Sequence, residues 1–260
     1  GTGDAGLVAL FRDISQEKAL QAQKDRFIAH ASHELRTPLA NIKTRLYLLR
    51  KQPDKLQAHL DVINRVTDSM TELIENLLDI SRFERGVIPL YCQPVALAEL
   101  IEEVIAIQQP EAERKDITLR ASLPGQPLVI DADPQRISQV ITNLVNNAIN
   151  YTGEGGTITI ELAPVDPGDH GSARQAAIRV CDTGIGIPAE MLSQVFEPFF
   201  RANEDVAAGT GLGLTIAREI VHLHHGSIAV DSAVGQGTVF TVTLDLLESS
   251  QEHNNRAISD

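Results

Sequence analysis

The segment that decides the fold is LQAHLDVINRVTDSMTELIENLLDISRFER, residues 56 to 85. Its apolar positions recur in alternating steps of four and three, which is the spacing of a seam in a coiled coil or helix bundle. The members of this seam are Leu56, Leu60, Ile63, Thr67, Met70, Ile74 and Leu77. We therefore expect a long amphipathic helix whose apolar stripe must be covered by other helices.

A second helical segment precedes the first, at residues 15 to 50, and its apolar residues also recur every seven positions. The polar segment RKQPDK, residues 50 to 55, separates the two and predicts a helical hairpin. Two helices cannot bury both stripes alone, and the economical solution is to pair with a second copy in a four-helix bundle. The sequence therefore predicts a homodimer.

From about residue 87 the pattern changes to short apolar strands that alternate with helical runs. Helices are expected at 97–114, 133–150 and 211–225, and strands at TLRAS, LVIDA, TITIELA, AAIRVCD and GTVFTVTLDL. The last strands are grouped as hairpins, one of them around a turn-rich loop at 164–175, which favours a mixed sheet with helices on one face. The predicted fold class is therefore α+β and multidomain, with an α/β sandwich after the helical hairpin.

Bulk properties exclude several classes of function. The net charge of −13 opposes binding to nucleic acid or to an anionic membrane, and no apolar run approaches the roughly 20 residues of a membrane span. The only cysteines, Cys92 and Cys181, lie far apart, so we expect a reducing compartment and neither a disulfide framework nor a zinc site. The chain begins at Gly1 without a signal-peptide pattern, and we expect it to be a fragment of a longer protein.

The first helix contains the segment HASHELRTPL, residues 30 to 39. His33 falls at heptad position f, on the outer face, where a solvated surface histidine is the ordinary expectation. Glu34 could orient its ring or accept its proton, and Thr37 lies four residues on along the same face. Pro38 crowds the carbonyl of Glu34 and predicts a bend, at a cost of about 3 kcal/mol. These neighbours favour a reactive histidine over a plain surface one, whereas Pro38 taken alone could equally be a tolerated bend.

Four further segments suggest a site for a flat, anionic ligand. CDTGIGIP, residues 181 to 188, places Asp182 at the end of a strand, and GTGLGL, residues 209 to 214, opens a helix whose N–H groups could face a phosphate. FEPFFRANEDVAAG between them suits a mobile lid, and NLVNNAINYT places Asn143 and Asn147 on one helix face, able to bind a hard cation. Each is weak alone, since a glycine turn is commonly only a turn and paired asparagines are usually surface residues.

In this order the motifs resemble the catalytic core of a two-component sensor histidine kinase, over residues 14 to 246. The resemblance implies autophosphorylation of His33 with Glu34 as general base. It implies that Thr37 helps to aim water when the partner regulator is dephosphorylated. The implied partners are a second copy of the chain and the receiver domain of a response regulator, to whose aspartate the phosphoryl group passes.

The same resemblance implies a Bergerat-type ATP-binding domain with ATP and Mg²⁺ as ligands. Asn147 would hold the magnesium ion, Asp182 would accept from the adenine amino group, and Arg201 would reach the phosphates. The other nucleotide-binding residues that it implies are Asn143, Tyr151, Gly184, Gly186, Gly209, Gly211, Leu212, Gly213 and Thr238.

The resemblance also implies an order of domains. We expect a remnant of an upstream PAS-like sensor domain at 1–13, the dimerisation and phosphotransfer hairpin at 14–86, the ATP-binding domain at 87–248 and a polar tail at 249–260. The sensor domain itself would be missing from this chain. The expected location is the cytoplasm, either as a cytoplasmic protein or as the cytosolic part of a membrane-anchored sensor.

Two positions depart from the family pattern. Asn150 stands where many relatives have a lysine, which removes one charge that would neutralise phosphate, and His225 stands where relatives often have glycine. His222 and His225 could share a helix face, but a plain helix end capped by Gly226 is favoured over a metal pair there. Two other functions stay open: an ATP-driven conformational machine, opposed by the histidine segment and the hairpin, and a scaffold without phosphotransfer, which Asn150 permits.

Overall fold

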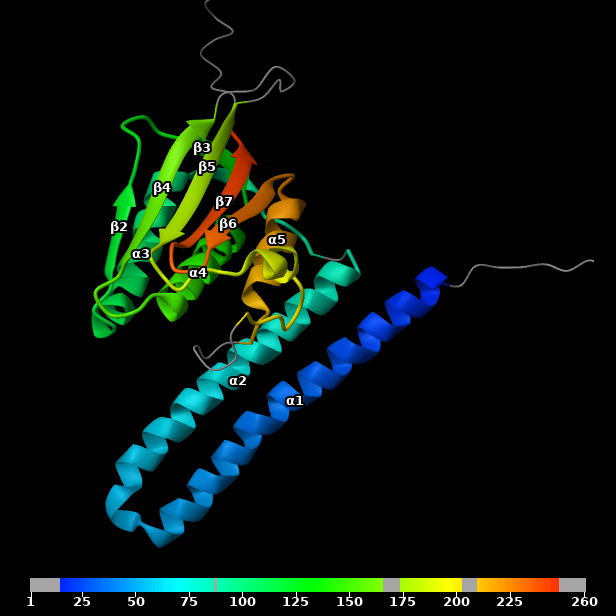
Figure 1. The fold of residues 1–260 in the computed structure, drawn as a ribbon, viewed down its shortest axis with the longest axis vertical. Helices are drawn as coiled ribbons and strands as arrows, with labels where there is room; N and C mark the ends of the chain where they lie inside the picture. Colours follow the sequence, from blue (N-terminus) through cyan, green and yellow to red (C-terminus); the bar gives the residue numbers. More distant parts are fainter. Residues whose placement is uncertain (1–14, 87, 166–173, 203–209, 248–260) are drawn as a thin grey trace, which may run out of the picture. The chain divides into compact units, whose positions relative to one another are not determined.

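The computed structural model describes residues 15–86, 88–165, 174–202 and 210–247 (Figure 1). By their contacts the residues form two compact units, Gly1–Leu73 and Ile74–Asp260. The predicted strand at 7–13 and the predicted tail at 249–260 lie outside the described residues, and the predicted domain boundaries stay a prediction. Among the described residues, no helix has both the length and the apolar character that crossing a bilayer requires.

The helices and strands follow the predicted order closely. The helices are α1 (Ser15–Lys51), α2 (Leu56–Glu84), α3 (Leu97–Arg114), α4 (Pro134–Tyr151) and α5 (Gly213–Leu223), with short 3-10 helices η1 (Pro53–Lys55) and η2 (Ala189–Gln194). The strands are β1 (Gln93–Ala96), β2 (Thr118–Ser122), β3 (Val129–Ala132), β4 (Thr157–Val165), β5 (Gln175–Asp182), β6 (Ser227–Ala233) and β7 (Gly237–Asp245).

The helical hairpin α1–α2 is confirmed, but the buried residues of α2 are not members of the predicted seam. His59 and Leu73, two heptads apart, are buried within the single chain. Leu56 and Leu60, in contrast, stay exposed, as do several large apolar residues of α1 such as Ile28. The side of α2 that carries His59 and Leu73 is therefore covered within the chain, whereas the exposed members of the predicted seam leave apolar surface for something outside the chain to cover.

The second unit contains a mixed sheet of five strands in the order β2-β4-β5-β7-β6 (Figure 1). β2 pairs with β4 in parallel and the other neighbours pair antiparallel. The predicted hairpin between β4 and β5 is confirmed, but its loop is shorter than expected because Pro164, Val165 and Gln175 belong to the paired strands. β6, whose sequence SIAVDSA alternates between exposed and half-buried residues, and β1, which pairs with β3, were not predicted.

The core lies between one face of this sheet and the helices. Alternate residues of the central strands, such as Ile160, Val180 and Phe240, are buried, whereas their neighbours in the sequence are more open. α4 covers the buried face with residues three and four apart, and each fully buried isoleucine or leucine contributes about 1.5 to 3 kcal/mol. This packing holds one end of α4 against the ends of β5 and β7, where the candidate site lies.

Local contacts set the start of α4 and the end of α5. Asp133 caps α4, because its Oδ1 accepts from the backbone N–H groups of Gln135 and Arg136 at 3.0 and 3.2 Å. At the end of α5, Gly226 donates to the carbonyl of Val221, but the left-handed residue is His225, with a φ of 57°. The expectation that Gly226 is the capping residue is therefore wrong, since the chain has a histidine at the position that favours glycine.

Candidate active site

A pocket opens between the end of α4, the ends of β5 and β7, and the start of α5. It is lined by Asn147, Tyr151, Asp182, Ile185, Gly186, Ile187, Val195, Phe200, Arg201, Ala202, Leu214 and Thr238. Half of these are residues that the sequence predicted for nucleotide binding: Asn147, Tyr151, Asp182, Gly186, Arg201 and Thr238. The pocket therefore brings together segments that are far apart in the sequence.

Asp182 is the buried acid of this pocket, at the C-terminal end of β5, and is only 8% exposed. The backbone N–H groups of Gly184 and Thr238 donate to its Oδ1 at 2.8 and 3.2 Å. Burial raises the pKa of this carboxyl above its usual value, and the two backbone hydrogen bonds offset part of that rise. Since both bonds end on Oδ1, Oδ2 can accept a hydrogen bond from a ligand in the pocket.

The two asparagines of α4 have different surroundings although they lie one turn apart. Asn143 donates from Nδ2 to the backbone oxygen of Gly213 at 3.0 Å, and so ties α4 to the first residue of α5. Asn147 instead lines the pocket. The structure therefore places Asn147 where a ligand could contact it, whereas Asn143 supports the glycine-rich turn at the start of α5.

Two glycines of the site are required by close contacts with the chain itself. Gly186 has a φ of 69°, and a Cβ there would collide with the carbonyl oxygen of Ala233. Gly211 also has a φ of 69°, and a Cβ there would lie 2.7 Å from the carbonyl carbon of Phe199. Phe199 is itself left-handed, with a φ of 64°, and its N–H donates to the Gly211 oxygen at 2.9 Å. The glycine segments therefore shape the turns around the pocket.

The phenylalanine segment is anchored by its first aromatic ring. Phe196 packs edge-on against Phe240, with 6.3 Å between ring centroids, and the guanidinium of Arg218 lies over its ring. The hydroxyl of Thr215 donates to the Phe196 carbonyl at 3.0 Å. These contacts fix the start of the segment whose Arg201 lines the pocket. The rest of the predicted lid, with Gly209, lies outside the described residues.

The candidate phosphoacceptor lies on α1, in the first unit. The His33 side chain is 75% exposed, as position f predicts, and its Nδ1 is 3.7 Å from Oε1 of Glu34. The Thr37 hydroxyl donates to the backbone oxygen of His33 at 3.4 Å. Because Glu34 lies on the Nδ1 side, Nε2 is the ring nitrogen available to a reagent from solvent.

Comparison with known families matches both parts of the chain. Residues 23–86 match the His Kinase A (phospho-acceptor) domain, and residues 132–248 match the family described as histidine kinase-, DNA gyrase B- and HSP90-like ATPase. The catalytic domain of the histidine kinase ThkA is 33% identical; the match covers 59% of this chain and 95% of that one, with a TM-score of 0.50. The chain belongs to the two-component sensor histidine kinases.

Longer relatives carry the same core within larger proteins. The sensor protein GacS of Pseudomonas syringae pv. syringae is 33% identical to this chain, over 92% of its length and 27% of that protein. The ThkA structure in complex with the response regulator TrrA is 25% identical over 91% of this chain and 68% of that one, with a TM-score of 0.66. The chain spans between about a quarter and a half of the length of the curated relatives it matches first.

Asn150, where the sequence departs from the family pattern, has a charged neighbour that the sequence did not reveal. Lys115, which follows α3, donates from Nζ to Asn150 Oδ1 at 3.1 Å and to the Ile149 carbonyl at 3.2 Å. A lysine ammonium therefore lies beside residue 150 although the residue itself is neutral. A lysine at position 150 would face this ammonium, so the asparagine suits its surroundings.

Several predicted residues lie beside the pocket, and several residues that line it were not predicted. Gly184, Gly211, Leu212 and Gly213 are not among the residues that line the pocket, and they form the turns next to it. Sequence reasoning missed the apolar lining, which includes Ile185, Ile187 and Leu214. The signal was present in DTGIGIP and GTGLGL, where apolar side chains alternate with glycines and can face a flat ligand.

Proposed function

We propose that this chain is an ATP-dependent histidine autokinase that phosphorylates His33. The observation that carries the proposal is the exposed His33 ring with Glu34 at its Nδ1, on a segment that matches the phosphoacceptor family. The pocket around Asp182, on a segment that matches the ATPase family, supplies the nucleotide site. The phosphoryl group then passes to an aspartate of a response-regulator receiver domain, and the kinase also dephosphorylates that regulator.

At the acceptor, each group has a defined task. Nε2 of His33 attacks the γ-phosphorus of ATP, so that an N–P bond forms while the bond from the γ-phosphorus to the bridging oxygen breaks and ADP leaves. Glu34 accepts the proton from Nδ1, beside which its carboxylate lies. When the chain dephosphorylates the regulator, the Thr37 hydroxyl breaks its hydrogen bond to the His33 carbonyl. It then orients the water that hydrolyses the regulator's phosphoaspartate.

At the nucleotide, the residues that line the pocket fit the ligand. Asp182 accepts from the adenine amino group through Oδ2, which its two backbone hydrogen bonds do not use. The Asn147 amide offers an oxygen ligand that suits Mg²⁺, and Arg201 lines the same pocket as a cation for the phosphates. Bound magnesium would neutralise charge on the phosphates.

The expected partners follow from the exposed surface of the hairpin. Ile28, Leu46, Leu56 and Leu60 leave apolar surface along α1 and α2, which a second copy would cover to form a four-helix bundle. The complex of ThkA with TrrA supports a response regulator as the second partner. We place the chain in the cytoplasm, where ATP is available.

The test is to incubate the protein with γ-labelled ATP and magnesium. Acid-labile, base-stable label should appear on the wild type and be lost in His33→Gln, whereas His30→Gln, three residues earlier on the same helix, should keep it. Label that is absent from the wild type, or that survives in His33→Gln, would overturn the assignment. ATP hydrolysis without label would point instead to an ATP-driven conformational machine.

A further inference from the structure

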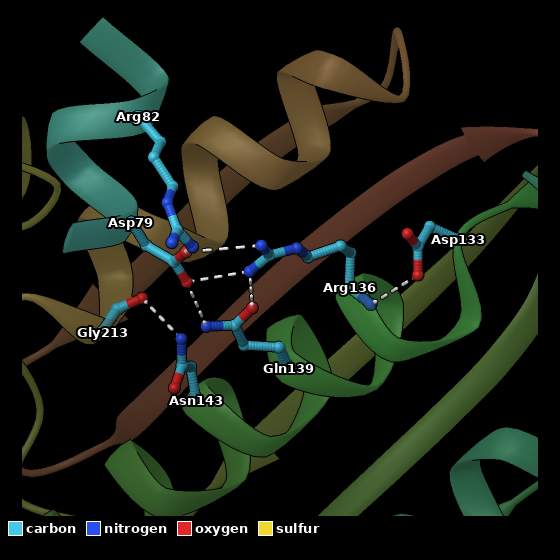
Figure 2. Close-up of polar contacts among 7 residues, drawn as sticks. All are labelled: Asp79, Arg82, Asp133, Arg136, Gln139, Asn143 and Gly213. Carbon is cyan, nitrogen blue, oxygen red and sulfur yellow. Dashed lines mark hydrogen bonds and ion pairs between the residues drawn. The ribbon is translucent and has the colours of Figure 1, made fainter. Parts of the chain in front are cut away.

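A partly buried ion pair joins the end of α2 to α4, and both partners lie within the second unit. Asp79 is only 8% exposed, and it accepts from Arg136 through both oxygens, at 2.8 Å from Nη1 and 3.3 Å from Nη2. Gln139 donates to the same carboxylate at 3.2 Å and accepts from Arg136 at 2.8 Å. Figure 2 shows these three side chains converging, and we call them the α2–α4 latch.

The linker between α2 and the nucleotide site is held to α4 at its other end as well. The backbone N–H of Tyr91 donates to Oδ2 of Asp133 at 3.1 Å. Asp133 caps α4 and lies three residues before Arg136, whose N–H it also binds (Figure 2). Residues 79 and 91 are therefore attached to the same turn of one helix. While both contacts are closed, neither residue 79 nor residue 91 can move away from the start of α4.

The surroundings of the latch favour its opening. A solvent-open cavity of about 550 Å³ adjoins it, lined by Arg82, Ile88, Pro89, Tyr91, Asp133, Gln135, Arg136 and Gln139. Arg82 is 3.8 Å from Asp79 and 60% exposed, so a second cation is ready to pair with Asp79 when Arg136 leaves. Water in the cavity can solvate the released guanidinium. Opening the latch therefore leaves neither charge buried without a partner. A buried charge without a partner is the usual cost of breaking a buried ion pair.

We propose that Asp79 is a positioning residue: its pairing with Arg136 restrains the nucleotide-binding part of the chain at the end of α2, and the latch opens before phosphoryl transfer. The inference rests on the proposed function. His33 must receive phosphate from ATP and later present it to a regulator, and the two cannot occupy Nε2 together. The nucleotide site must therefore occupy at least two positions relative to His33, one for transfer and one that leaves His33 free for the regulator. A closed latch allows only one of them.

The closed latch belongs to the resting state. Every group in it comes from the chain itself, so it forms without nucleotide, signal or regulator. Because the latch needs none of these, it holds the nucleotide site in the position that the chain adopts before any signal arrives. Weakening it should then speed transfer to His33 without changing how ATP is bound, because Asp79, Arg136 and Gln139 are not among the residues that line the nucleotide pocket.

The experiment is a double-mutant cycle on the rate of His33 labelling. Asp79→Asn and Arg136→Gln should each raise the rate about three- to tenfold with the KM for ATP unchanged, since each weakens one charge-assisted contact and tenfold corresponds to about 1.4 kcal/mol. The double variant should be no faster than the single ones, because each removes the same restraint. Glu75→Gln, an exposed acid one turn earlier on α2, should leave the rate unchanged.

A second readout tests the latch independently of activity. Amide hydrogen exchange over residues 79 to 91 should quicken in Asp79→Asn and not in Glu75→Gln. Rates that fall or stay unchanged, effects that multiply in the double variant, an altered KM or unaltered exchange would each overturn the proposal. If the wild type carries no label at His33, the proposed function fails, and the exchange measurement still decides whether the latch restrains the linker.

Discussion

Replacing Asp182 by asparagine separates the two tasks of the buried acid. An amide has the same shape as the carboxylate, and its Oδ1 can still accept from Gly184 and Thr238. The substitution removes the buried charge whose desolvation raises the pKa of the group. We therefore expect the free energy of unfolding at neutral pH to stay the same or to rise, by up to about 1 kcal/mol.

Nucleotide binding should respond in the opposite direction. In Asp182→Asn the Oδ2 acceptor becomes an NH₂ donor that faces the donor amino group of adenine. A hydrogen bond to a charged group contributes about 1.5 to 3 kcal/mol, so the affinity for ATP should fall about 10- to 100-fold. Titration calorimetry with ATP and a thermal melt of the same sample measure both quantities, and Asp231→Asn, an exposed aspartate of β6, is the matched control.

The raised pKa of Asp182 sets the sign of the pH dependence. Its protonation stabilises the fold, so this contribution is fully present below the unfolded pKa of about 3.9 and is lost as pH rises through the raised folded pKa. ATP affinity should run the other way and weaken as pH falls through that pKa, because a protonated Oδ2 no longer offers a free carboxylate oxygen. An affinity for ATP unchanged in Asp182→Asn, or a collapse of its fold, would refute this assignment of the two oxygens.

Three further substitutions test single features. His225→Gly should raise the free energy of unfolding by about 0.5 to 1 kcal/mol, because the left-handed backbone at this position disfavours a side chain. A melting temperature lower than that of the wild type would contradict this prediction. His59 is buried at 4% exposure and both its ring nitrogens lack a hydrogen-bond partner among the described residues, so His59→Leu should stabilise the hairpin by about 1 to 2 kcal/mol in chemical denaturation. Pro38→Ala restores a helix hydrogen bond next to His33 and should alter the ratio of kinase to phosphatase activity; unchanged activities would show that the proline is only tolerated.

Most elements could be predicted because their signals are local. The strand TLRAS and the helix 97–114 were found with the bounds that the structure gives, since period-two and period-3.6 patterns appear within a few residues. β1 was missed because four residues that include Pro94 carry too little pattern. The end of α5 was assigned to the wrong residue, because a glycine in the sequence is a stronger signal than a histidine in a left-handed conformation.

For the candidate site, too, local features could be predicted from the sequence and contacts between elements could not. The sequence alone determined which residue types could do the chemistry, because His33 with Glu34, the asparagine segment and the glycine segments are each contiguous. Only the tertiary structure decided that Asn143 holds Gly213 while Asn147 faces the pocket, that Lys115 lies beside Asn150, and that Arg136 pairs with a carboxylate 57 positions earlier. Periodicity reports the face of one element, whereas the distance between atoms of different elements depends on how the whole core packs.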